Sequence, residues 1–214
     1  TEQTRTTFRP PARGKKHMAV SGHALAPQAA MRILDKGGNA VDAGVAGTFC
    51  LAVLQPDMVS FAGVAPLIIH DARSGDYRTI TGLGCWPKAA TTEYFIENHR
   101  GELPMGILRT VVPGLPDACL QALEKYGTMS FTEVIADARD LAANGFPVHQ
   151  FLSNGIRESE ESYRLWDENR EIFLPDGKVP EVGTLFFQKD LGKTFDCMAE
   201  AEKRAQAAGA SREQ

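Results

Sequence analysis

The sequence predicts an α+β fold in which a β-sheet is covered by helices. Residues 40–54 are apolar around nearly the whole circumference of a helix, and such a helix must be buried. Residues 67–81 consist of two β-rich runs joined by Ser74-Gly75-Asp76, which is typical of a tight hairpin turn. Helical patterns before and after these segments supply the layers that would cover the sheet.

The segments around the apolar helix have clear boundaries. Residues 18–21 are predicted as a short strand, and residues 24–36 as a helix that ends at Gly37-Gly38. Asn39 is a favoured N-cap residue, so the apolar helix should begin directly after it. Residues 57–66 have no clear period and are predicted as a loop.

The remainder of the chain is predicted as follows. Helices are expected over residues 89–98, 115–126, 131–143, 148–170 and 190–204. A strand is expected over residues 107–112, and a short strand or an extended segment over residues 182–187. Residues 1–17 are predicted as a flexible N-terminal arm, residues 18–204 as part of a single domain, and residues 205–214 as a ragged end.

Composition excludes several classes of protein. The chain has 43% hydrophobic and 23% charged residues with a net charge of -4, so it has no basic stripe for nucleic acid. The apolar helix of about fifteen residues is shorter than the roughly 20 needed to cross a bilayer. Because the first residues include no apolar signal-peptide core, we expect a cytoplasmic protein without a membrane partner. The four cysteines are far apart, so we expect mostly buried free thiols and neither a metal site nor a cofactor.

No catalytic motif is complete within the chain. Gly82-Leu83-Gly84 lacks the third glycine of a dinucleotide fingerprint, and the histidines lack metal-ligand spacing. His23 is interpreted as a structural histidine, and no residue pattern selects a Ser/His/Asp triad.

One extended set of motifs resembles a known family. Ser21-x-His23-x-Leu25-Ala26, followed by Ile33-Leu34-x-x-Gly37-Gly38-Asn39-Ala40-Val41-Asp42-Ala43, is similar to the start of the large subunit of γ-glutamyltranspeptidases. Weaker similarities follow at Leu67-Ile68-Ile69, Asp71 to Gly75, Val112-Pro113-Gly114, Tyr126-Gly127, Ala142 to Val148 and Asp190 to Thr194.

The resemblance implies an N-terminal-nucleophile hydrolase with an αββα four-layer sandwich that a separate small subunit completes. Such enzymes are made as a precursor that cuts itself, and the threonine freed at the start of the small subunit is the nucleophile. No catalytic residue is therefore expected in this chain. Thr1 is not expected to be the nucleophile, because a basic, proline-containing arm follows it rather than a strand.

The sequence departs from the family where the substrate should bind. Aligned on Pro87, Leu83 stands where the transpeptidases have the arginine that pairs with the substrate carboxylate, and leucine cannot form that pair. The hypothesis is that Leu83, Cys85 and Trp86 line a more apolar acyl pocket, although Trp86 also fits ordinary core packing. Arg109 is either a replacement cation or an ordinary arginine at a strand edge.

The predicted function is thus an amidohydrolase acting on a small amide that is not a standard γ-glutamyl compound. Two alternatives stay open: a true γ-glutamyltransferase or glutathione hydrolase, and an unprocessed, non-catalytic scaffold of the same fold. The expected partners are the small subunit from the same precursor and the amide substrate, and a dimer of such heterodimers is also open.

Overall fold

The computed structural model describes residues 12–211, so most of the predicted N-terminal arm, including Thr1, lies outside the described residues. The longer helices are α1 (Leu25–Asp35), α2 (Ala40–Leu54), α3 (Thr92–His99), α4 (Leu115–Tyr126), α6 (Ala136–Asn144), α7 (Gln150–Glu158) and α10 (Lys189–Ala207). The shorter elements are β1 (Leu67–Asp71), β2 (Asp76–Ile80), η1 (Ile107–Arg109), α5 (Phe131–Val134), β3 (Phe146–Pro147), α8 (Glu160–Tyr163), α9 (Asp167–Phe173), η2 (Pro175–Gly177) and β4 (Leu185–Phe186).

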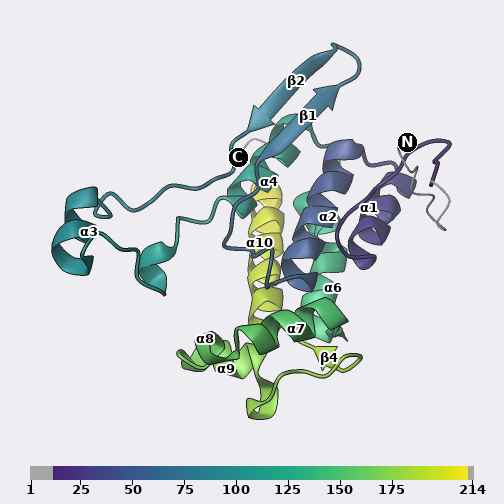
Figure 1. Ribbon diagram of the computed structural model, residues 1–214. Helices are drawn as coiled ribbons and strands as arrows, with labels where there is room; N and C mark the ends of the chain where they lie inside the picture. The colour runs from purple at the N-terminus through teal and green to yellow at the C-terminus, as the bar shows by residue number, and fades with distance from the viewer. Residues whose placement is uncertain (1–11, 212–214) are drawn as a thin grey trace, which may run out of the picture.

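Helix α2 lies at the centre of the helical body, as its apolar sequence predicts. It packs against α1, α4, α5 and α6, while α10 packs on α5 and α6 (Figure 1). The ring of Phe49 in α2 lies 5.7 Å from that of Phe131 and 5.8 Å from that of Phe195 in α10, both edge to face. Such aromatic contacts add to the hydrophobic burial that holds α2 in place.

The beginning of α2 is fixed by a capping box. Asn39 accepts hydrogen bonds from the amides of Val41 and Asp42, and the Asp42 carboxylate accepts one from the amide of Asn39. This arrangement satisfies amides that the first turn of a helix leaves without partners. The predicted N-cap is therefore confirmed.

The strands form two separate antiparallel pairs. β1 pairs with β2 in the register Leu67 to Ile80, which confirms the predicted hairpin, and β3 pairs with β4 with Phe146 opposite Phe186. Among residues 12–211 these two-stranded sheets do not join. The four-layer sandwich is therefore not completed within this part of the chain.

Two predicted strands are wrong. Residues 18–21 form no strand. With His17 they line a groove over α1 and α2, and no strand among residues 12–211 pairs with them. Residues 107–112 form the 3-10 turn η1 and then a segment that pairs with no strand among the described residues. The segment 182–187, predicted as a short strand or an extended segment, contains the short strand Leu185–Phe186.

The predicted helices are present with different divisions. The helix over 131–143 is divided at Ile135 into α5 and α6, and the charged stretch over 148–170 forms α7, α8 and the start of α9. Helix α10 continues to Ala207, three residues beyond the predicted end. No helix within the described part of the chain is both long and apolar enough to span a membrane.

The four cysteines are free, and only half of them are buried. Cys50 and Cys119 lie in the core, where burial raises the pKa of each thiol to about 12, so both are neutral and unreactive. Cys85 and Cys197 are exposed, which corrects the prediction of mostly buried thiols. Cys85 lies in the segment that the sequence assigns to substrate binding.

Candidate functional site

The predicted substrate-binding residues lie on a projecting excursion of the chain, residues 83–112, which we call the arm. Figure 1 shows the arm leaving the end of β2, extending away from the helical body with α3 at its far side, and returning to the start of α4. The two limbs of the arm meet at its base, where the amide of Val112 donates to the carbonyl of Cys85 over 2.8 Å.

The base of the arm is a crossing of backbones that only glycine permits. A Cβ on Gly84 would clash with the carbonyl oxygen of Val112, and one on Gly114 would clash with the carbonyl of Gly82 and lie 2.5 Å from the amide nitrogen of Gly84. Gly82 and Gly84 also have φ of +53° and +69°, which disfavour other residues. Leu83 is thus held between two fixed glycines.

The loop after α2 is hydrogen-bonded to the same crossing. The carbonyl of Gly63 accepts hydrogen bonds from the amides of Gly114 and Leu115, both at 3.0 Å, and the amide of Ala65 donates to the carbonyl of Gly82 over 2.9 Å. The loop predicted over residues 57–66 is therefore joined to the segment that carries Leu83. Sequence reasoning missed the role of Gly114, although Gly82, Gly84 and Gly114 together were the signal for a close backbone approach.

Leu83, Cys85 and Trp86 are exposed along one extended segment. The side chain of Leu83 is 54% exposed and that of Trp86 40%, so neither belongs to the main core. The ring of Trp86 packs against Phe95 of α3 at 5.5 Å, and Phe95 also contacts Tyr94 and His99. Trp86 therefore packs within this aromatic cluster rather than in the main core, and part of its indole is exposed to solvent.

Arg109 lies on the returning limb of the arm. Its Nε donates to the carbonyl of Leu103 over 3.0 Å, and its side chain is exposed. It lies three residues before Val112, whose amide pairs with Cys85. The structure thus places Arg109 in η1 rather than at a strand edge.

The family-like motif around Asn39 has a structural role. The buried carboxylate of Asp42 accepts hydrogen bonds from the amide of Thr128 at 2.9 Å, the hydroxyl of Thr128 at 2.6 Å and the amide of Met129 at 3.2 Å. Burial alone would raise the pKa of this carboxyl, but the hydrogen bonds from Thr128, Asn39 and Met129 outweigh it and lower the pKa. Asp42 is therefore ionised and joins α2 to the loop between α4 and α5.

His23 and His149 form a pair beside the end of α2. Their ring centroids are 4.9 Å apart, and the Nδ1 atoms accept hydrogen bonds from the amides of Leu25 and Leu152 respectively. Nε2 of His149 lies 3.0 Å from the carbonyl of Leu54, to which it donates when neutral. Burial, and then the charge of His149, lower the pKa of His23. The hydrogen bond from the Leu25 amide agrees with the structural interpretation of His23.

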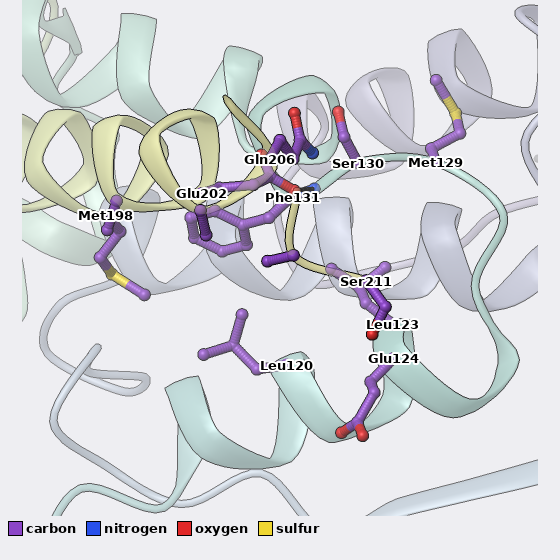
Figure 2. Close-up of a pocket in the computed structure, with 13 residues that line it drawn as sticks. Leu120, Leu123, Glu124, Met129, Ser130, Phe131, Met198, Glu202, Gln206 and Ser211 are labelled. Atoms are coloured by element: carbon purple, nitrogen blue, oxygen red, sulfur yellow. Dashed lines mark hydrogen bonds between the residues drawn. The ribbon is translucent and has the colours of Figure 1, made fainter. Parts of the chain in front are cut away.

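One groove is separate from the arm. It has a volume of about 730 Å³ and lies between α4, α5 and α10, with Leu120 and Met198 on opposite walls (Figure 2). Its lining is mostly aliphatic and methionine side chains, with Glu124 and Glu202 among the polar groups. None of the predicted substrate-binding residues lines it, and no group of three or more potential metal ligands occurs within residues 12–211.

Comparisons with known proteins agree with the motifs and the fold. The sequence profile of the gamma-glutamyltranspeptidase family matches residues 26–209. The glutathione hydrolase-like YwrD proenzyme of Bacillus subtilis is 36% identical over 194 residues, covering 90% of this chain and 37% of that protein. The Acylase ACY 1 proenzyme of a Pseudomonas species is 32% identical over 204 residues, covering 91% of this chain and 36% of that protein.

A solved structure gives the same result at the level of the fold. The Helicobacter pylori gamma-glutamyltranspeptidase superposes with a TM-score of 0.84 at 30% identity, covering 90% of this chain and 56% of that chain. The chain spans little more than a third of the length of the two curated relatives described above. The arrangement around α2 is therefore that of an N-terminal-nucleophile hydrolase of this type, and the chain belongs to the gamma-glutamyltranspeptidase family.

Proposed function

We propose that this chain is part of the large subunit of an autoprocessed amide hydrolase whose preferred substrate is not a standard γ-glutamyl compound. The observation that carries the proposal is Leu83, an exposed leucine fixed between two glycines where the family resemblance expects a carboxylate-binding arginine. An acyl group without an α-carboxylate needs no cation there. Leu83, Cys85 and Trp86 would instead contact an apolar acyl chain.

The chemistry proposed for the complete enzyme uses a residue of the small subunit. The threonine hydroxyl at the start of that subunit attacks the amide carbonyl, and its own α-amine accepts the proton. Backbone amides stabilise the oxyanion, the amine leaves, and water or another amine then releases the acyl group from the threonine. The proposed contribution of the present chain is to bind and orient the acyl group.

The relatives support both hydrolysis and variation in the acyl group. Proteins similar to this chain include one named as a glutathione hydrolase-like proenzyme and one named as an acylase proenzyme. The second candidate is a true γ-glutamyl hydrolase or transferase. Arg109 favours it, because it is an exposed cation on the returning limb of the arm, where its Nε donates to the carbonyl of Leu103.

The test is an assay of the complete precursor. Mass spectrometry should find two chains, the second beginning with threonine; a single intact chain would favour a non-catalytic scaffold. The purified enzyme is then assayed on γ-glutamyl, phenylacetyl and hexanoyl p-nitroanilides. We expect kcat/KM for the apolar amides to exceed that for the γ-glutamyl compound by about tenfold or more, since each misplaced polar contact costs 1–3 kcal/mol.

The variant Arg109→Ala separates the two candidates. Under the main proposal it leaves turnover of the apolar amides nearly unchanged. Rapid γ-glutamyl turnover by the wild type that is lost in Arg109→Ala would establish the second candidate and reject the apolar pocket.

A further inference from the structure

The loop of residues 57–66 carries one aromatic side chain, Phe61, and its ring packs into the helical body. The adjacent residues Ser60 and Ala62 are exposed, whereas Phe61 is half-buried. Its ring lies 5.5 Å from that of Phe195 in α10, edge to face, and 6.2 Å from that of Phe49 in α2. In Figure 1 the loop runs from the end of α2 past α10 to β1, so this ring attaches the loop to two helices.

The two helical rings give Phe61 a defined position. Phe49 and Phe195 are both fully buried and contact each other at 5.8 Å, also edge to face. Edge-to-face pairs stabilise beyond the area that they bury, and a close-packed interior leaves such rings little freedom to move. Phe61 is therefore fixed relative to α2 and α10, although Met58 and Val64 of the same loop are exposed.

A short run of backbone joins the ring to the start of α4. Phe61 lies inside the turn that the amide of Gly63 closes by donating to the carbonyl of Ser60 over 2.9 Å. The carbonyl of Gly63 in turn accepts the amides of Gly114 and Leu115. The ring and the returning limb of the arm are thus separated by two residues and one pair of hydrogen bonds.

The same loop touches the segment that leads into the arm. The amide of Ala65 donates to the carbonyl of Gly82, and a Cβ on Gly82 would lie 2.1 Å from the carbonyl oxygen of Ala65. Ala65 is itself buried and lies four residues after Phe61. Because Gly82 directly precedes Leu83, a displacement of the loop would move Leu83 as well.

We propose that Phe61 is a positioning residue for the acyl-binding segment, and that its ring sets how far Leu83 stands from the helical body. The inference rests on the proposed function for the role of Leu83, and it assigns Phe61 no contact with substrate. A smaller side chain would free the loop from Phe195, so that Leu83 would take several positions and bind the acyl group less tightly.

A matched control lies in the same aromatic cluster. The ring of Phe131 contacts that of Phe49 at 5.7 Å, but Phe131 belongs to α5 and its amide is bonded to Glu202 of α10. Its side chain lines the separate groove in Figure 2. Phe61→Leu and Phe131→Leu therefore remove the same atoms from one cluster, and only the first loosens the loop.

Hydrogen exchange on the full precursor is the direct test. We expect the amides of Ala65, Gly114 and Leu115 to exchange about tenfold faster in Phe61→Leu, because their bonds are made by or to the loop. In Phe131→Leu the same amides should change by less than about twofold relative to those of α6. Equal acceleration in the two variants would overturn the positioning role.

Kinetics of the processed enzyme give a second readout. For hexanoyl p-nitroanilide, Phe61→Ala should raise KM by about fivefold or more and leave kcat within about twofold, since the acyl group is held alike in the ground and transition states. Phe61→Leu should recover part of the loss, and it carries the test alone if Phe61→Ala does not fold. The same KM in the wild type, Phe61→Leu and Phe131→Leu would also overturn the proposal.

Failure of the proposed function can be told apart from failure of this inference. If the enzyme hydrolyses no apolar amide and exchange still increases only in Phe61→Leu, the positioning of the segment stands and the proposed substrate class fails. If apolar amides are hydrolysed and neither exchange nor KM distinguishes Phe61→Leu from Phe131→Leu, the proposed function stands and Phe61 is a packing residue only.

Discussion

At the scale of single residues, a few polar side chains decide how apolar helices are joined. Asp42 is the clearest case, because its carboxylate is buried and every hydrogen bond it accepts comes from an N–H or O–H group of the loop around Thr128 or of the preceding N-cap. A buried charge of this kind stabilises the fold only while all of its partners are present.

Asp42→Asn should therefore be strongly destabilising. In either orientation the amide NH₂ would face an N–H or O–H donor, so we expect a loss of about 2–4 kcal/mol in the free energy of unfolding. Urea denaturation of the wild type and the variant measures this loss. The control Asp190→Asn removes an exposed carboxylate paired with Lys193 and should change stability by less than about 0.5 kcal/mol. Equal effects for the two variants would contradict this role of Asp42.

His23 makes stability depend on pH. Its pKa is lowered in the folded state by burial and by His149, so the unfolded chain binds a proton more readily. The free energy of unfolding should fall as the pH decreases through 6.5, the ordinary value, until the lowered folded pKa is reached. In His23→Asn, which can still accept the Leu25 amide, this dependence should become weaker between pH 7 and 5. An identical pH profile in the variant would show that other groups cause it.

Leu83 is the residue on which substrate choice should depend. Leu83→Arg would restore a cation where the family resemblance expects one, and a charge-assisted hydrogen bond to a carboxylate contributes about 1.5–3 kcal/mol. The ratio of kcat/KM for γ-glutamyl over hexanoyl p-nitroanilide should therefore rise by about tenfold or more in the assembled enzyme. Leu83→Met is the matched control and should leave the ratio nearly unchanged. A ratio insensitive to both variants would place the acyl group elsewhere.

At the scale of elements, packed helices hold the backbone crossing at the base of the arm. Leu115, directly after the crossing, is fully buried at the start of α4, and α4 packs on α2. Because the loop after α2 is bonded to the same backbone, the central helix indirectly fixes the position of Leu83. The chemistry is thus expected to depend on glycines that carry no functional group.

Gly114→Ala tests this crossing. Gly114 has a φ of −94°, which any residue can adopt, so the effect would be steric and would displace Gly82 and Gly84. We expect a loss of about 1–3 kcal/mol in stability by urea denaturation. The control Gly44→Ala, in the middle of α2 with nothing within 4 Å, should instead stabilise by roughly 0.5–1 kcal/mol. A neutral Gly114→Ala would mean that the crossing adjusts easily.

At the scale of the whole molecule, residues 12–211 do not close into a complete sandwich by themselves. Two isolated strand pairs, an arm with its own aromatic core and a groove between α4 and α10 all present surfaces that a larger assembly could bury. Association with the proposed small subunit should therefore raise stability by mass action.

The midpoint of thermal unfolding tests that expectation. With the small subunit present at 100 times its dissociation constant, stabilisation of about 2.7 kcal/mol should raise the Tm of the chain by roughly 5–10 °C. Differential scanning calorimetry of the chain with and without its partner measures the shift. The same Tm in both samples would mean that the chain is complete without this partner.

Local patterns predicted most helices because their signals lie within a few residues. The apolar run of α2, its Asn39 cap and the hairpin at β1 and β2 were confirmed, since burial, capping and turn geometry depend on residues that are adjacent in the sequence. The strands predicted at residues 18–21 and 107–112 were wrong, because a strand exists only where another strand pairs with it. Pairing is a property of distant segments that a local pattern does not contain.

The sequence by itself determined the family and the central helix, because the motif from Gly37 to Ala43 and the apolar run after it are contiguous. Only the tertiary structure decided that Asp42 joins α2 to Thr128, and that Gly82, Gly84 and Gly114 cross where Leu83 begins the arm. These contacts join residues 30 or more positions apart, and their energies arise from close approach and buried hydrogen bonds. Such contacts exist only after the chain has folded.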